Sequence, residues 1–271
     1  MKTIILVSAS IALSVVAAIV MRALVRRLKL ERVNFRGAEI PAGFGFVLVL
    51  AALPVYAGMA AGHMDARTAV FAAAVLGFGI IGLLDDMYGT REAGGFRGHL
   101  SLLKQGHVST GLMKAVLGGV LALSLGFVVS GYSPAEGILN GLLIALSANT
   151  LNLLDLRLGR AVSCFWVGLL TLAAAQVGRL QTWPELIPVI VPAVWLTMLD
   201  RSAKVMLGDA GSNVLGAVLG LALVYEIGIP AKIVLVIIMV GMHAYSEKYS
   251  ITKLIEGNRI LRQVDRLLGE R

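Results

Sequence analysis

The chain has 271 residues, of which 58% are apolar and only 15% are charged, and its formal net charge is +8. This composition lies outside the usual range of water-soluble domains and excludes an ordinary soluble globular protein. The single cysteine, Cys164, gives no basis for a disulfide or a thiolate metal site.

Apolar stretches close to membrane-spanning length recur along the whole chain, with the charged residues confined between them. The first stretch is followed at once by the basic run RALVRRLKLER, which predicts a retained transmembrane helix and not a cleaved signal peptide. We predict nine transmembrane helices, at residues 3–22, 42–62, 66–84, 112–131, 136–156, 160–178, 184–200, 212–229 and 231–247. The predicted fold class is therefore all-α, a polytopic membrane helical bundle that forms a single domain over residues 1–250.

The basic residues predict how this bundle is oriented in the membrane. With the amino terminus outside, most of the 24 Lys and Arg residues fall on the inner side, as the positive-inside rule requires. The distribution of the charge therefore needs no nucleic-acid partner. Residues 251–271 are predicted to form a cytoplasmic amphipathic helix that lies on the bilayer, with Arg259, Arg262 and Arg266 near anionic headgroups.

Several acidic residues lie where the predicted helices end on the cytoplasmic side. Asp85 and Asp86 end the third helix, Asp155 ends the fifth, and Asp209 precedes the eighth. A single aspartate at a helix end has an ordinary explanation, because such an end meets water. The combination of these acids with nearby Asn, Gly and Ser residues instead favours a shared site.

The spacing of these residues sharpens this interpretation. Asn149, Asn152 and Asp155 step by three, so they lie on one face of a helix and should face the bundle interior or a wet cavity. Asp85 and Asp86 are neighbours on a helix and point about 100° apart. One of them can therefore reach a metal or substrate while the other supports it.

The segment GDAGSNVLG predicts a phosphate site at the start of the eighth helix. Asp209 lies beside Gly208, Gly211 and Ser212, and the first turn of the helix offers backbone N–H groups at residues 210–213. Carboxylates with basic side chains and amide donors are suited to Mg²⁺ bridging a diphosphate. The scarcity of histidine and cysteine argues against zinc.

Four stretches in this order resemble signature motifs of one family: GLLDDMYG, FRGHLSLLKQGHVSTGLMK, NTLNLLDLRLGRA and MLGDAGSNVLG. They are similar to those of the polyprenyl-phosphate N-acetylhexosamine-1-phosphate transferases (glycosyltransferase family 4). The resemblance covers about residues 30 to 225. It implies a cell-membrane enzyme that uses Mg²⁺ to transfer a sugar-1-phosphate from a UDP-sugar to undecaprenyl phosphate, releases UMP, and initiates cell-envelope polysaccharide synthesis.

The resemblance also implies roles for individual residues. Asp85 and Asp86 match an aspartate pair that contacts the lipid phosphate and the metal region, acting as positioning groups or as a base. Asp209 matches the family's metal-binding aspartate, and Asp155, which falls in the Asn-x-x-Asn-x-x-Asp stretch, is the second predicted ligand. The catalytic set is thus Asp85, Asp86, Asp155 and Asp209. The substrate-binding set is Lys114, Asn149, Asn152, Gly208, Gly211 and Ser212.

Departures from the family pattern leave alternatives open. Leu156 and Leu158 replace a glycine and a second aspartate, and His243 stands where many members have a histidine cluster. A noncatalytic relative that binds lipid phosphate is therefore a second interpretation, and a transporter is a third. Several basic residues either replace lost phosphate contacts or only follow the positive-inside rule: Arg157, Arg160, Lys248, Lys253 and Arg259. The sugar and the oligomeric state stay open, and a homodimer is one alternative.

Overall fold

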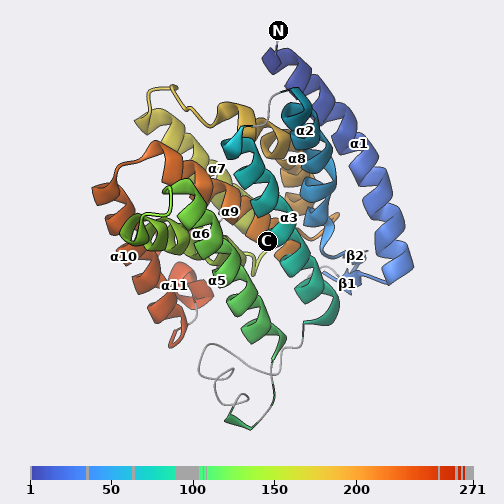
Figure 1. Cartoon of the computed structure of the whole chain (residues 1–271). Coiled ribbons are helices and arrows are strands. Elements are labelled where there is room, and N and C mark those ends of the chain that lie inside the picture. Colours follow the sequence, from blue (N-terminus) through green and yellow to red (C-terminus); the bar gives the residue numbers. More distant parts are fainter. Residues whose placement is uncertain are drawn as a thin grey trace.

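The computed structural model forms a bundle of helices with one small β-hairpin (Figure 1). It describes residues 2–34, 37–62, 65–89, 104–105, 107, 109–249, 251–259, 262–263 and 265. The helices are α1 (Lys2–Leu28), α2 (Val47–Gly62), α3 (Ala66–Tyr88), α5 (Thr110–Val129), α6 (Pro134–Leu154), α7 (Arg160–Ala175), α8 (Trp183–Arg201), α9 (Gly208–Glu226), α10 (Ile229–Ser246) and α11 (Ile251–Gly257).

The all-α membrane architecture is confirmed. Within the described part of the chain, 8 helices are long and apolar enough to cross a membrane, so the chain is a multi-pass membrane protein. The sixth predicted segment forms α7, which is apolar but has only 16 residues. At 1.5 Å per residue this helix spans about 24 Å, less than the ~30 Å hydrocarbon core. The prediction of nine full-length helices is thus met by eight long helices and one short one.

Helix α9 is the most deeply buried of the long helices, and it packs against α3, α6 and α7. Small residues allow these close approaches, since bundle helices in lipid associate largely through backbone proximity. Gly216 lies against Ala148 of α6, and a Cβ on Gly82 of α3 would collide with the backbone of Asp209. Changing these glycines would therefore push α9 away from its neighbours.

A β-hairpin joins α1 to α2, where the sequence predicted only a loop. Strands β1 (Glu31–Val33) and β2 (Glu39–Pro41) pair antiparallel. The chain then enters a 3-10 turn, η1 (Phe44–Phe46), in which the N–H of Phe44 donates to the Met206 carbonyl at 3.0 Å. The Met206 N–H donates back to the Pro41 carbonyl at 2.7 Å. These bonds fix the hairpin to the segment that leads into α9.

The carboxyl-terminal tail begins as a helix, as predicted, and it contacts the turn between α6 and α7. Arg157 of that turn pairs with Glu256 of the tail, and Arg160, the first residue of α7, pairs with Asp265. Arg259 and Arg262 are exposed. The predicted position of Arg266 lies outside the described residues.

Candidate active site

A cavity of ≈ 1470 Å³ opens at the end of the bundle where α3 and α6 finish and α5 and α9 begin. We call this end of the molecule the cavity end. The hairpin supplies one wall through Arg32, Asn34 and Gly43. Eight of the ten residues in the predicted site line the cavity: Asp85, Asp86, Lys114, Asn149, Asn152, Asp155, Gly208 and Asp209.

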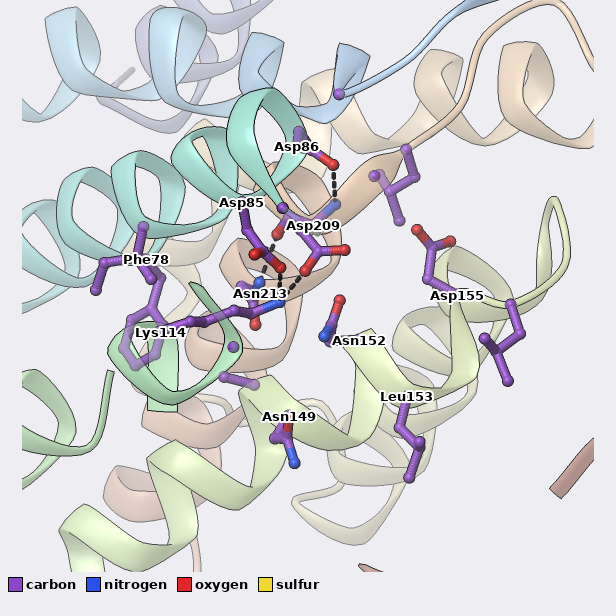
Figure 2. Close-up of a pocket in the computed structure, with 18 of the residues that line it drawn as sticks. Phe78, Asp85, Asp86, Lys114, Asn149, Asn152, Leu153, Asp155, Asp209 and Asn213 are labelled. Carbon is purple, nitrogen blue, oxygen red and sulfur yellow. Dashed lines mark hydrogen bonds and ion pairs between the residues drawn. The ribbon is translucent and has the colours of Figure 1, made fainter. Parts of the chain in front are cut away.

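Lys114 joins two of the predicted carboxylates. Its ammonium group lies 3.1 Å from Asp85 Oδ2 and also forms an ion pair with Asp209 (Figure 2). The three side chains come from three different helices, and each is largely shielded from solvent. We call Lys114, Asp85, Asp209 and the adjacent Asn152 the lysine cluster.

Asn152 completes the lysine cluster through both ends of its amide. The orientation that satisfies the hydrogen bonds places Oδ1 2.9 Å from Lys114 Nζ and Nδ2 3.1 Å from Asp209 Oδ1. The Ser212 hydroxyl lies 3.1 Å from the same amide. Asn149, one helical turn earlier, lines the cavity, so the predicted shared face of α6 is confirmed. This face of α6 places the neutral amides of Asn149 and Asn152 beside the charged side chains of the cavity.

Asp86 has a different environment from its neighbour Asp85. Its carboxylate accepts hydrogen bonds from the backbone N–H groups of Asp209 and Ala210, each at 2.9 Å. A Cβ on Gly43 or Gly208 would approach the same carboxylate to 2.9 Å or less, so the two glycines leave room for it. Asp86 therefore fastens the end of α3 to the first turn of α9, where a negative charge is favoured by the helix dipole.

This contact changes the expected role of the α9 amino terminus. The sequence predicted free N–H groups at residues 210–213 for a phosphate, but the Ala210 N–H is already bonded to Asp86, as is the N–H of Asp209. Gly211 packs against Gly45, and Ser212 is fully buried and donates to the Gly208 carbonyl at 3.0 Å. Neither of these two residues lines the cavity. Of the three predicted small residues, only Gly208 reaches it.

Asp155 lies just after the last residue of α6, against the backbone N–H of Gly208. Burial raises the pKa of this carboxyl well above its ordinary value, and the nearby charges of Asp200 and Asp86 raise the pKa further. Figure 2 shows Asp155 apart from the carboxylates that Lys114 joins. Asp155 thus belongs to the cavity wall but not to the lysine cluster.

Asp200 is a fully buried residue that organises two loops at the cavity end. It accepts hydrogen bonds from the Gly159 N–H at 2.6 Å and from the Leu207 N–H at 2.9 Å. These loops carry Arg157 before α7 and Gly208 at the start of α9. The residue is therefore a structural support and does not itself line the cavity.

The donor set of the lysine cluster fits Mg²⁺. In the described residues, no group of three His, Cys, Asp or Glu side chains lies close enough to hold a metal. Mg²⁺ nevertheless needs only one or two protein carboxylates, and water and substrate phosphates complete its shell. Asp85 and Asp209 converge on one cation in this structure, the Lys114 ammonium. The pair suited to a metal is therefore Asp209 with Asp85, not Asp209 with Asp155.

The cavity continues from the lysine cluster into an apolar arm between α3, α5 and α6. Phe78, Ile81, Ala115, Gly118, Gly119, Ala145 and Leu146 line it. Gly119 has nothing within 4 Å of the position its Cβ would take, and Gly118 has only the edge of Phe78 at 3.6 Å. One cavity thus presents charges at one side and a smooth apolar surface at the other.

The sequence analysis did not predict the hairpin residues of the site, because no motif or spacing distinguishes them. Arg32 and Asn34 stand in what reads as a basic inner loop, and Gly43 is one of 31 glycines. The left-handed backbone of Gly43, with φ +63, is visible only in the folded chain. His243 does not line the cavity; its Nδ1 lies 2.7 Å from the Met239 carbonyl.

No protein-family model and no curated protein sequence matches the chain. The fold and the cavity therefore define its class: a multi-pass helical membrane protein with a cavity that combines a lysine cluster and an apolar arm.

Proposed function

We propose that this chain is a Mg²⁺-dependent phosphoglycosyl transferase. It transfers a sugar-1-phosphate, of the N-acetylhexosamine type, from a UDP-sugar to a polyprenyl phosphate and releases UMP. The observation that carries this proposal is the lysine cluster, in which Asp85, Lys114 and Asp209 meet at the charged side of a cavity with an apolar arm. The resemblance of the four sequence stretches supports the same reaction.

The reaction needs positioning and charge neutralisation more than covalent chemistry from the protein. An oxygen of the lipid phosphate forms a bond to the phosphorus that carries the sugar, and the bond from that phosphorus to the UMP oxygen breaks. UMP leaves with the electron pair of that bond. Bound Mg²⁺ would supply electrostatic stabilisation of the diphosphate.

Each residue of the lysine cluster has a defined part in this proposal. Asp85 and Asp209 would hold the metal, and the Lys114 ammonium, which pairs with both carboxylates in this structure, would be available to a phosphate oxygen. Asn152 orients Asp209 through its amide. Asp86 is a positioning residue, because its carboxylate accepts hydrogen bonds from two backbone N–H groups at the start of α9.

The apolar arm is suited to the first isoprene units of the acceptor lipid. Its lining lacks charged groups, and Gly118 and Gly119 keep the wall of α5 flat. A chain in this arm would leave its phosphate at the lysine cluster. Larger side chains at position 119 should therefore weaken acceptor use without changing affinity for the nucleotide sugar.

We further propose that the chain resides in the cell membrane with its amino terminus outside and its carboxyl terminus and cavity end cytoplasmic. The asymmetry of the basic residues supports this orientation. It brings the cavity to the side where nucleotide sugars are made, so the product can initiate a cell-envelope polysaccharide. A reporter fused after residue 271 that is active only in the periplasm would contradict the orientation.

The direct test is UMP release by the purified protein with undecaprenyl phosphate and a panel of UDP-sugars, with and without Mg²⁺. We expect metal-dependent UMP release with one or a few donors. Asp209→Asn is the inactive control, because it removes a metal ligand. Release at the same rate in EDTA would remove the metal from the mechanism.

A noncatalytic lipid-phosphate binder is the second candidate. The observation that favours it is the lysine cluster itself, since Lys114 satisfies both carboxylates without a metal. Leu158, where the family has a second aspartate, points the same way. Binding of undecaprenyl phosphate without UMP release from any donor would establish this candidate over the enzyme.

A further inference from the structure

Arg157 lines the same cavity from the turn between α6 and α7 and is not part of the lysine cluster. Its side chain is about one third exposed (32%). The proposed reaction gives Arg157 no role, and the family motif does not require a charged residue at this position. A guanidinium at the wall of a cavity needs an anionic partner, and in this structure the tail supplies one.

Arg157 of this turn and Arg160 at the start of α7 hold the tail in different ways. Arg160 forms two hydrogen bonds to Asp265, with Nε 2.7 Å from Oδ1 and Nη2 3.0 Å from Oδ2. Both side chains are almost fully buried, at 3% and 10% exposed. Arg157 instead forms an ion pair with Glu256, which is 46% exposed, and its Nη1 lies 3.8 Å from Asp265. We call Arg160 with Asp265 the anchor, and Arg157 with Glu256 the latch.

The anchor and the latch should differ greatly in strength. A bidentate arginine–carboxylate pair shielded from solvent is held in one geometry, and breaking it leaves a buried charge without a partner. An exposed ion pair contributes only about 0–1 kcal/mol. The tail can therefore stay attached through Asp265 while Glu256 exchanges with another anion.

The geometry points to a phosphate-binding subsite at Arg157, which Glu256 caps in this structure. We propose that the phosphate or diphosphate group of a ligand in the cavity displaces Glu256 and pairs with the Arg157 guanidinium. The planar fork of arginine binds phosphate as well as carboxylate, and a phosphate brings more charge than the carboxylate it replaces. Glu256 of the tail thus competes with the ligand for Arg157, and ligand binding breaks the Arg157–Glu256 pair.

This inference deepens the proposed function, on which it depends only for the identity of the molecule that carries the phosphate. The subsite requires an anion in the cavity and does not require turnover. A binding experiment therefore tests it separately from the transferase assay, and the protein can fail one test and pass the other.

The experiment is isothermal titration calorimetry of the purified full chain at a fixed Mg²⁺ concentration. Inorganic pyrophosphate is the soluble probe, and dihexanoyl phosphatidic acid is the lipid probe. We expect Glu256→Gln to tighten binding of at least one probe about two- to fivefold, because an exposed competing ion pair is removed. The probe that responds identifies whether a free or a lipid phosphate uses the subsite.

The variant Arg157→Met should weaken binding of the same probe about tenfold or more, since a charge-assisted contact is lost. It should also abolish the gain from Glu256→Gln in the double variant. If Arg157→Met lowers Tm strongly, Arg157→Lys replaces it, because it keeps the charge and loses the fork. Binding by Arg157→Lys should lie between that of the wild type and that of the Met variant.

Two exposed residues at the opposite end of the bundle provide controls with the same changes of charge. Glu136→Gln and Arg179→Met should leave both affinities unchanged. The subsite is refuted if Glu256→Gln tightens neither probe or if Glu136→Gln gives an equal gain. It is also refuted if the gain persists when Arg157 is absent.

Discussion

Two clusters of opposite charges meet the same cavity, and they are built differently. In the lysine cluster, Lys114, Asp85 and Asp209 come from three membrane helices and are shielded from solvent. In the latch, Arg157 and Glu256 come from a turn and the tail, and both are partly exposed. The same kind of ion pair is thus shielded from solvent in one place and partly exposed in the other. The difference lies in how firmly the backbone holds each partner.

Removing the negative charge from the lysine cluster should have the largest effect. We expect Asp209→Asn to reduce transfer about 10³-fold, the upper range for loss of one preorganised electrostatic contact. Its Tm should change little, because Asp85 still pairs with Lys114. UMP release is the measurement. Turnover at the wild-type rate would exclude Asp209 as a metal ligand.

Removing the positive charge tests whether the lysine cluster is a cation site. Lys114→Met leaves Asp85 and Asp209 facing one another without a counterion, so we expect a loss of about 3 kcal/mol in unfolding free energy. Mg²⁺ should restore part of this loss, and it should stabilise the variant more than the wild type. Thermal unfolding with and without Mg²⁺ measures both effects. An equal Mg²⁺ response in the two proteins would contradict a shared cation position.

The packing around Asp86 can be tested with two glycines of the hairpin region. Gly43 and Gly37 both have positive φ, at +63 and +76. Replacement by alanine adds backbone strain of about 1 kcal/mol or more at each. Only at Gly43 does the new Cβ also meet the Asp86 carboxylate, at 2.9 Å, whereas Gly37 has nothing within 4 Å. Gly43→Ala should therefore lower Tm and transfer more than Gly37→Ala, and equal effects would remove the structural role of Asp86.

The smallest effect is expected at the latch. Glu256→Gln should change the unfolding free energy by less than about 0.5 kcal/mol, as for other exposed pairs. Asp265→Asn, at the anchor, should cost about 2 kcal/mol, because Arg160 is left buried beside a neutral amide. Thermal unfolding of the two variants side by side measures the contrast. A larger loss for Glu256→Gln would mean that the latch holds the tail.

The amino-acid sequence determined the membrane fold and most of the polar face of the cavity. Long apolar segments can satisfy their backbone groups in lipid only as helices, so the eight long helices among the described residues follow almost directly from the apolar segments of the sequence. The three-residue step from Asn149 to Asp155 fixed the cavity-facing side of α6, since helical periodicity is local. The sequence was sufficient to predict the orientation of a side chain wherever helical periodicity alone sets that orientation.

Only the tertiary structure decided which of these groups meet. It joined Asp85 with Asp209 through Lys114. It also bonded the Asp86 carboxylate to the backbone of α9 and left Gly211 and Ser212 outside the lining of the cavity. The fold brought the hairpin to the cavity and paired the tail with Arg157, which lines the cavity. These contacts link residues far apart in the chain, and they depend on how closely glycines allow α9 to approach its neighbours. Sequence spacing within one helix carries no information about that approach.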